Sequence, residues 1–96
     1  MGFRLTQAAD EDVIGIFHSG LVQFGLEQAD SYHDALFDVF DLIANNPRMG
    51  RERDELTPPM RVHPFRSHII LYIIEDADVL IVRVRHAHED WVSNPV

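Results

Sequence analysis

The stretch MRVHPFRSHIILYIIEDADVLIVRVRH, residues 60–86, contains three successive runs that are typical of β-strands. The runs are MRVHPF (60–65), HIILYIIE (68–75) and VLIVRVRH (79–86), and EDAD at the junction of the last two is a turn of hairpin length. The middle run is apolar at nearly every position, which predicts a central strand with both faces buried. Pro64 lacks a backbone donor, so the first run is predicted to be an edge strand or to contain a bulge. Together the runs predict a small, mostly antiparallel sheet.

Side chains of the last run are expected to alternate between the two faces of the sheet. One face is predicted to receive Leu80, Val82 and Val84, and the other Val79, Ile81, Arg83 and Arg85. The first of these faces is predicted to lie in the core, while the second changes from apolar to cationic toward the end of the strand.

Two amphipathic patterns precede the sheet and predict a helical hairpin. Thr6 follows the short apolar segment Phe3–Leu5, which we expect to form a strand, and Thr6 has the side chain of a helix N-cap. Apolar residues then recur at helical spacing as far as Gly25, the expected C-terminal stop: Val13, Phe17, Leu21 and Phe24. A second stripe follows and ends at Asn45, Asn46 and Pro47: Tyr32, Leu36, Val39, Phe40 and Ile43. Because the link between the patterns is very short, the helices are predicted to lie antiparallel.

The predicted order of elements is β-α-α-β-β-β, an α+β fold in which the helical hairpin packs on the sheet. Residues 44–59 are rich in proline and arginine and are predicted to be a loop between the two parts. A chain of 96 residues forms one domain, residues 1–96, with a single modest core. The solvated face of the second helix is predicted to contain Asp30, Asp34, Asp38 and Asp41.

The helical stripes are expected to face the sheet as part of the core: Phe17, Leu21, Phe24, Phe40 and Ile43. The first helix nevertheless contains more apolar side chains than one buried stripe can accommodate. We therefore also expect an exposed apolar groove, which a segment of a partner protein occupies.

Composition and charge exclude several classes of protein. The formal net charge of −8 disfavours non-specific binding of nucleic acid, and the eight basic residues are all arginine, which favours forked contacts to carboxylate or phosphate groups. Residues 48–96 contain seven of these arginines. The absence of cysteine excludes disulfides and thiolate metal sites. The chain contains neither a membrane-length apolar run nor a signal peptide, so we expect a cytoplasmic protein.

The segment RVRHAHEDW, residues 83–91, concentrates the side chains that are able to do chemistry. Arginines that bind a phosphate, with His86 or His88 as general acid or base, are what a small ribonuclease needs. The simpler hypothesis is that Arg83 and Arg85 pair with carboxylates of this chain or of a partner. A pair of histidines two residues apart on a strand is weak evidence for a metal site, and no nucleophile motif or phosphate-binding loop is present. No metal or cofactor is therefore expected.

Three segments resemble a known family. NNPRMGRERDEL (45–56), MRVHPFRSHIILY (60–72) and VRVRHAHEDW (82–91) occur together as they do in the ParE branch of the RelE/ParE toxin superfamily, and the resemblance spans residues 3–92. It implies a bacterial toxin that a ParD-like antitoxin neutralises, with DNA gyrase as the target and blocked replication as the result. Antitoxins of this family lay a C-terminal helix and an extended segment on the toxin, so the implied antitoxin contacts are Phe17, Leu21 and Phe24.

The sister RelE branch cuts ribosome-bound messenger RNA, and Arg61 and Arg83 match its phosphate-binding positions. The chain departs from that branch because it has no lysine, and its tail HAHEDW has no tyrosine. We therefore expect a non-enzymatic inhibitor without catalytic residues, while a ribonuclease and an antitoxin-binding member without toxicity remain alternatives. The surface that contacts the target or the antitoxin is predicted to contain Arg61, Arg83, Arg85, His86, His88, Asp90 and Trp91.

Overall fold

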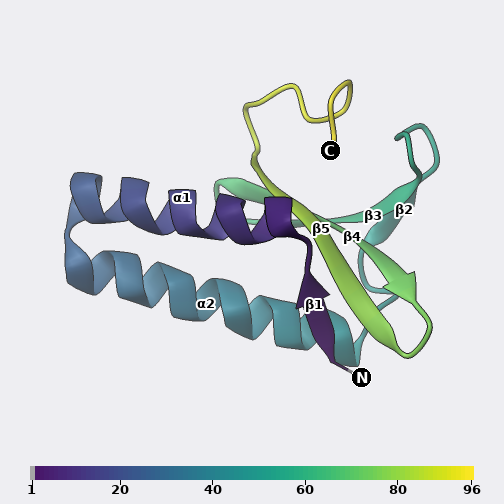
Figure 1. Cartoon of the computed structure of the whole chain (residues 1–96), viewed down its shortest axis with the longest axis horizontal. Helices are drawn as coiled ribbons and strands as arrows, with labels where there is room; N and C mark the ends of the chain where they lie inside the picture. Colours follow the sequence, from purple (N-terminus) through teal and green to yellow (C-terminus); the bar gives the residue numbers. More distant parts are fainter. Residues whose placement is uncertain (1) are drawn as a thin grey trace.

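The computed structural model describes residues 2–96, in which two helices pack on a five-stranded mixed sheet (Figure 1). The elements follow in the order β1 (Phe3–Leu5), α1 (Gln7–Phe24), α2 (Leu26–Asn45), β2 (Arg51–Arg53), β3 (Met60–Phe65), β4 (His68–Glu75) and β5 (Asp78–His86). The predicted α+β fold is confirmed, with β2 as an additional strand inside the predicted loop.

Local signals at the ends of α1 determine where it begins and ends. The Thr6 hydroxyl accepts a hydrogen bond from the backbone N–H of Ala9 at 3.0 Å, as a helix N-cap does, and donates to the Val82 carbonyl at 2.7 Å. The helix is thereby attached to the sheet at its first turn. Gly25 alone links α1 to α2, with a φ of 91° that favours glycine. The predicted cap, stop and hairpin are confirmed.

The sheet has the strand order β1-β5-β4-β3-β2, in which β1 runs parallel to β5 and the other neighbours are antiparallel. Strand β4 lies in the middle, and Ile70, Leu71 and Tyr72 along it are fully buried. The prediction of a central strand with two apolar faces is therefore confirmed.

A β-bulge in β5 changes which face its side chains reach. Leu71 pairs with Arg83 and Tyr72 with Ile81, so Val82 is an extra residue between the two pairs. Val84, beyond the bulge, packs in the same core as Ile81, whereas Val82 packs on the opposite face. The expectation of unbroken alternation, with Val82 and Val84 on one face, is wrong because the extra residue exchanges the two faces.

Strand β3 is not the edge strand, because β2 pairs with its first half. The pairs join Arg51 to Val62, Glu52 to Arg61 and Arg53 to Met60. Pro64 lies beyond this short ladder and has its pairing partner only in β4, so a strand interrupted by proline is tolerated there.

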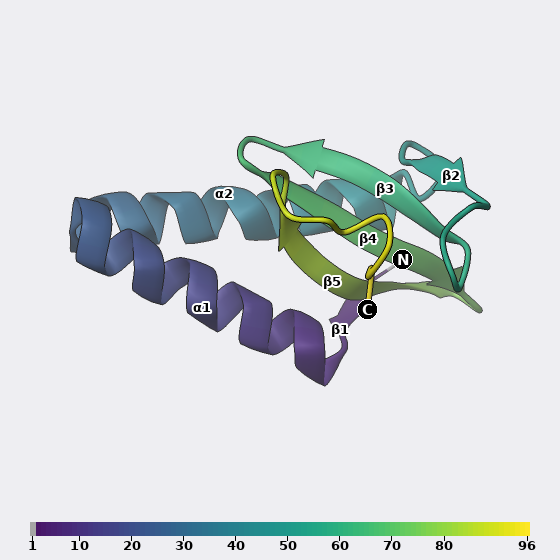
Figure 2. The ribbon, with the colours of Figure 1, turned by 90° about the horizontal axis from the view of Figure 1, so that it is seen from above.

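Apolar residues cover both faces of the sheet. On the helical face the buried cluster includes Phe40, Ile43, Tyr72 and Ile81. On the other face a smaller cluster of Leu56, Met60, Val62 and Leu71 is covered by Trp91. Figure 2 shows the C-terminal segment crossing the strands on that side.

The far end of the helical hairpin extends beyond the sheet (Figures 1 and 2). Phe40 and Ile43 are buried as expected, but Leu21 and Phe24 are exposed. The expectation that Leu21 and Phe24 belong to the core is therefore wrong, because no strand reaches under that part of α1. Other large apolar side chains exposed on the hairpin are Ile14, Val22, Leu26 and Leu42. Neither helix is apolar enough along its length to cross a membrane.

Candidate functional site

Arg83 forms a bidentate ion pair that joins β5 to α1. Its Nε and Nη2 atoms donate to the two carboxylate oxygens of Asp12 at 2.6 and 2.8 Å, and the backbone N–H of Val84 donates to Asp12 at 3.0 Å. The hydrogen bond that Arg83 donates to Asp12 raises the pKa of Arg83. Arg83 therefore makes a bidentate ion pair within the chain, and its guanidinium is poorly placed to bind a phosphate.

Arg85, two residues further along β5, is also paired within the chain. Its guanidinium donates to Glu89 at 3.1 Å and to the backbone carbonyl of Asn94. Glu89 also accepts from the backbone N–H of His86 at 2.8 Å. This hydrogen bond from His86, followed by the one from Arg85, holds the pKa of Glu89 below its usual value. The predicted cationic face of β5 is thus largely neutralised by acids of the same chain.

Arg61 does not join this group, because β4 separates its strand from β5. Its Nη1 atom donates to the carbonyl of Gly50 at 2.8 Å. The Tyr72 hydroxyl accepts from the N–H of Gly50 at 2.8 Å and donates to the Pro47 carbonyl at 2.7 Å. A Cβ atom on Gly50 would lie 2.4 Å from that hydroxyl, which explains the glycine. Arg61 and Tyr72 therefore shape the turn after α2.

Histidines gather where β4 begins and β5 ends. The ring of His86 lies 5.3 Å from that of His68 and 5.3 Å from that of His88, measured between centroids. The Tyr32 hydroxyl lies 2.6 Å from Nδ1 of His68, and burial lowers the pKa of His68 and raises that of Tyr32. His88 is exposed. Among residues 2–96, no three His, Asp or Glu side chains are arranged to hold a metal ion.

Asp90 and Trp91 lie on the C-terminal segment, on the far side of the sheet from the helices. Asp90 is exposed and accepts a hydrogen bond from the N–H of Ser93 at 3.4 Å. The Trp91 ring packs on the second apolar cluster, with the Arg53 guanidinium 5.4 Å from its centroid. Trp91 thus closes the core on this face, whereas Asp90 and His88 face solvent.

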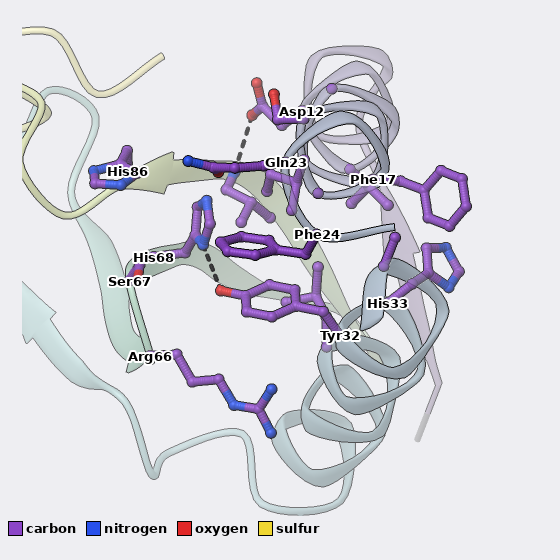
Figure 3. A pocket seen from close by; sticks show the side chains of 18 of the residues that line it. Asp12, Phe17, Gln23, Phe24, Tyr32, His33, Arg66, Ser67, His68 and His86 are labelled. Carbon is purple, nitrogen blue, oxygen red and sulfur yellow. Dashed lines mark hydrogen bonds between the residues drawn. The ribbon is translucent and has the colours of Figure 1, made fainter. Parts of the chain in front are cut away.

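A pocket of about 720 Å³ lies between the helical hairpin and the ends of β4 and β5 (Figure 3). The helices contribute its apolar side chains together with polar ones such as Glu11 and His33, and the β3–β4 turn and the adjoining strand ends contribute mostly polar ones. The residues that matter most for its chemistry are Phe17, Phe24, Tyr32, Leu36, Arg66, His68, His86 and Glu89.

The pocket includes two of the three predicted antitoxin contacts and several residues that sequence reasoning missed. Phe17 and Phe24 line it, whereas Leu21 lies outside it on the exposed surface. The sequence pattern predicts Tyr32 as part of a helical stripe and contains no signal that Arg66 or His68 belongs to a site. No local pattern joins Tyr32 to His68, because 36 residues separate them in sequence.

Comparisons with known proteins agree with this architecture. Residues 3–91 match the family model described as the ParE toxin of type II toxin-antitoxin system, parDE. Toxin ParE1 of Mycobacterium tuberculosis is 32% identical over 93 residues, covering 96% of this chain and 95% of that protein. Toxin ParE1 of Caulobacter vibrioides is 31% identical over 84 residues, covering 88% and 86%. A solved structure titled as the chromosomal ParDE TA system from P. aeruginosa has the same fold, with a TM-score of 0.77 at 18% identity over 90% of this chain and 95% of that one.

Proposed function

Because the chain belongs to the ParE toxin family of type II toxin-antitoxin systems, we propose that a ParD-like antitoxin neutralises it by binding the exposed apolar part of the helical hairpin. The observation that carries this proposal is the group of large apolar side chains that no other part of the described chain covers, Val22, Phe24 and Leu26. An exposed patch of this kind marks an interaction surface, and an amphipathic partner segment is its ordinary occupant.

We further propose that the toxin inhibits DNA gyrase in the cytoplasm, by binding rather than by catalysis. Family membership supports the target. The pairing of Arg83 with Asp12 and of Arg85 with Glu89 supports binding over RNA cleavage, because both guanidinium groups already have carboxylate partners. His88 and Asp90 are exposed on the C-terminal segment and provide the polar part of the target contact. Trp91 packs on the second apolar cluster and so attaches this segment to the sheet.

Supercoiling by purified DNA gyrase tests this proposal. Added toxin is expected to inhibit supercoiling and to accumulate covalent gyrase–DNA complexes, and prior addition of the antitoxin encoded beside the toxin is expected to prevent both effects. No inhibition by a large excess of folded toxin would contradict the gyrase proposal. Cleavage of messages on translating ribosomes by that same sample would instead favour the ribonuclease.

A double substitution of exposed residues tests the contact itself. His88→Ala with Asp90→Ala is expected to weaken gyrase inhibition at least about tenfold without unfolding the chain, because neither side chain is buried. The matched control is Asp34→Ala with Asp38→Ala, which removes two exposed acids from the solvated face of α2. Equal inhibition by the two double variants would count against a target contact at the C-terminal segment.

A further inference from the structure

The strand side of the pocket contains two histidines and an arginine, beside Ser67 and Glu89. His68 from β4, His86 from the end of β5 and Arg66 from the preceding turn line it together. In Figure 3 the two imidazoles and the arginine lie on the strand side of the pocket, and Phe24 extends from the helices toward them. The pocket therefore places polar groups opposite an apolar surface, as small-ligand and side-chain pockets do.

The hydrogen bonds of the two imidazoles assign their tautomers. Nδ1 of His86 accepts from the backbone N–H of His88 at 3.2 Å, so the proton of the neutral ring is on Nε2. The Tyr32 hydroxyl lies 2.6 Å from Nδ1 of His68. With this hydroxyl as the donor, the neutral His68 ring also has its proton on Nε2. Each ring keeps one N–H donor even when it is uncharged.

The acids nearest these donors are paired with arginines of the same chain. Asp12 is neutralised by Arg83, and Glu89 by Arg85, so two acids at the pocket already have partners. The Arg66 guanidinium lies over the Tyr32 ring at 5.3 Å and makes no salt bridge within residues 2–96.

Two further ionisable side chains line the pocket from the helices. Glu11 lines the pocket from α1, the helix opposite the histidines, and accepts a hydrogen bond from Gln7 at 3.3 Å. His33 lines it from α2 and stacks on Phe37. On the strand side, Arg66 is therefore the charged group that lines the pocket without a salt-bridge partner among residues 2–96.

We propose that this pocket binds an apolar side chain of the antitoxin together with an adjacent carboxylate, which accepts hydrogen bonds from Nε2 of His68 and of His86. The apolar side chain lies against Phe17, Phe24 and Leu36. This inference rests on the proposed function, and it specifies the chemistry of the antitoxin segment: an aromatic or branched residue beside Asp, Glu or a terminal carboxylate. Phe24 belongs both to the exposed hairpin surface and to the lining of the pocket. One bound segment of the antitoxin therefore occupies both.

Two small probes test the chemistry of the pocket without the antitoxin. N-acetylphenylalanine carries the ring and the carboxylate, and N-acetylphenylalaninamide carries the same ring without the charge. In NMR titrations of the full chain, the carboxylate probe is expected to bind at least about tenfold more tightly, because hydrogen bonds to charged groups are the stronger ones. Its largest shifts are expected at His68 and His86. Equal binding of the two probes, or shifts confined to another surface, would overturn the proposal.

Ring-for-ring substitutions identify the donors. His86→Phe, alone and with His68→Phe, is expected to abolish the preference for the carboxylate probe while affinity for the amide probe remains. The matched control is His63→Phe, which replaces a half-buried histidine of β3 that does not line the pocket. If the double variant does not fold, His86→Phe alone decides, because His86 is not buried. A preserved carboxylate preference in His86→Phe would contradict its role as a donor.

Calorimetry with the antitoxin completes the test. The His68→Phe, His86→Phe double variant is expected to bind the antitoxin at least about tenfold more weakly than the unmodified chain, with the His63→Phe control unchanged. Undiminished antitoxin binding would overturn the proposal. Absence of antitoxin binding by the unmodified chain would overturn the proposed function and the antitoxin as occupant, whereas the probe titrations would still determine whether the pocket prefers a carboxylate.

Discussion

The two halves of the helical hairpin are both rich in apolar residues, but only one half is buried. Near the sheet, Ala9 and Phe40 are 0% exposed, whereas Val22 and Phe24 at the far end are 76% and 57% exposed. Helical periodicity is present in both halves. Amphipathicity alone therefore does not distinguish a surface that packs on the protein's own sheet from one that is available to a partner.

The boundary between the halves lies where the strands end. Helix α1 has 18 residues and is about 27 Å long at 1.5 Å per residue. Strand β4 begins at His68, which meets Tyr32 on α2, and helical residues beyond this contact have no strand beneath them. The length of the helices relative to the sheet thus creates both the pocket and the exposed surface.

The largest effect is expected from Phe40→Ala in the buried half. Phe40 is fully buried and its ring lies 5.4 Å from Phe3 and 5.1 Å from Phe37, so truncation leaves a cavity among packed aromatic rings. The free energy of unfolding, measured by urea denaturation, is expected to fall by about 3–5 kcal/mol. The same truncation of Phe24 is the control, expected to change stability by less than about 0.5 kcal/mol. Similar losses in the two variants would remove the distinction between the halves.

Local signals account for the parts of the fold that were predictable. Thr6 correctly predicted the helix cap, and Gly25 correctly predicted the one-residue link. Both features depend on the residue itself, since capping needs the hydroxyl and a positive φ favours glycine. Strand β2 was missed because Arg51–Arg53 has no apolar alternation and pairs only because β3 lies beside it. The bulge at Val82 likewise depends on pairing across the sheet.

The site was less predictable than the fold, because its contacts join distant parts of the chain. Asp12 and Arg83 are 71 residues apart, so no pattern in the sequence identifies Asp12 as the partner of Arg83. The wall of the pocket near Arg66 and His68 arises only when β4 lies next to α2. Residue type indicated which side chains were able to do chemistry, but the tertiary contacts determine which of them are available.

A second large effect is expected from Asp12→Ala, which removes the salt bridge between the buried half and β5. The side chains of Arg83 and Asp12 are 21% and 16% exposed, so solvent screens the pair only partly. Loss of Asp12 leaves the guanidinium and the Val84 N–H without their partner, and we expect a cost of about 2 kcal/mol, below that of a fully buried pair.

The control for Asp12→Ala is Arg4→Ala, which breaks the exposed contact with Glu75 and is expected to cost less than about 0.5 kcal/mol. Both variants are compared by urea denaturation at the same ionic strength. A cost for Asp12→Ala no larger than that for Arg4→Ala would show that the Asp12–Arg83 contact does not stabilise the fold.

A smaller effect is expected from acidification, because His68 lies at the boundary between the halves. Burial lowers the pKa of His68 and that of His63 from the ordinary value of 6.5, so the unfolded chain takes up protons that the folded chain does not. Their contribution to stability is present above pH 6.5 and is lost as pH falls from there toward the lowered pKa values. Denaturation midpoints between pH 7.5 and 5 measure this loss.

The substitution His68→Phe is expected to make that pH dependence shallower, whereas His18→Phe, at an exposed position of α1, is expected to leave it unchanged. An identical pH profile for His68→Phe and the unmodified chain would mean that His68 does not couple protonation to folding.

The smallest effect on stability is expected from Val22→Ser with Phe24→Ser in the exposed half. These side chains already contact water in the isolated toxin, so the free energy of unfolding is expected to change by less than about 0.5 kcal/mol. Antitoxin binding, measured by calorimetry, is expected to weaken by at least about 2 kcal/mol, since a buried aromatic anchor is lost from the interface. The control Asp34→Ala, on the solvated face of α2, is expected to change neither quantity. A double serine variant that unfolds would place these residues in the core after all, and one that binds the antitoxin normally would move the antitoxin to another surface.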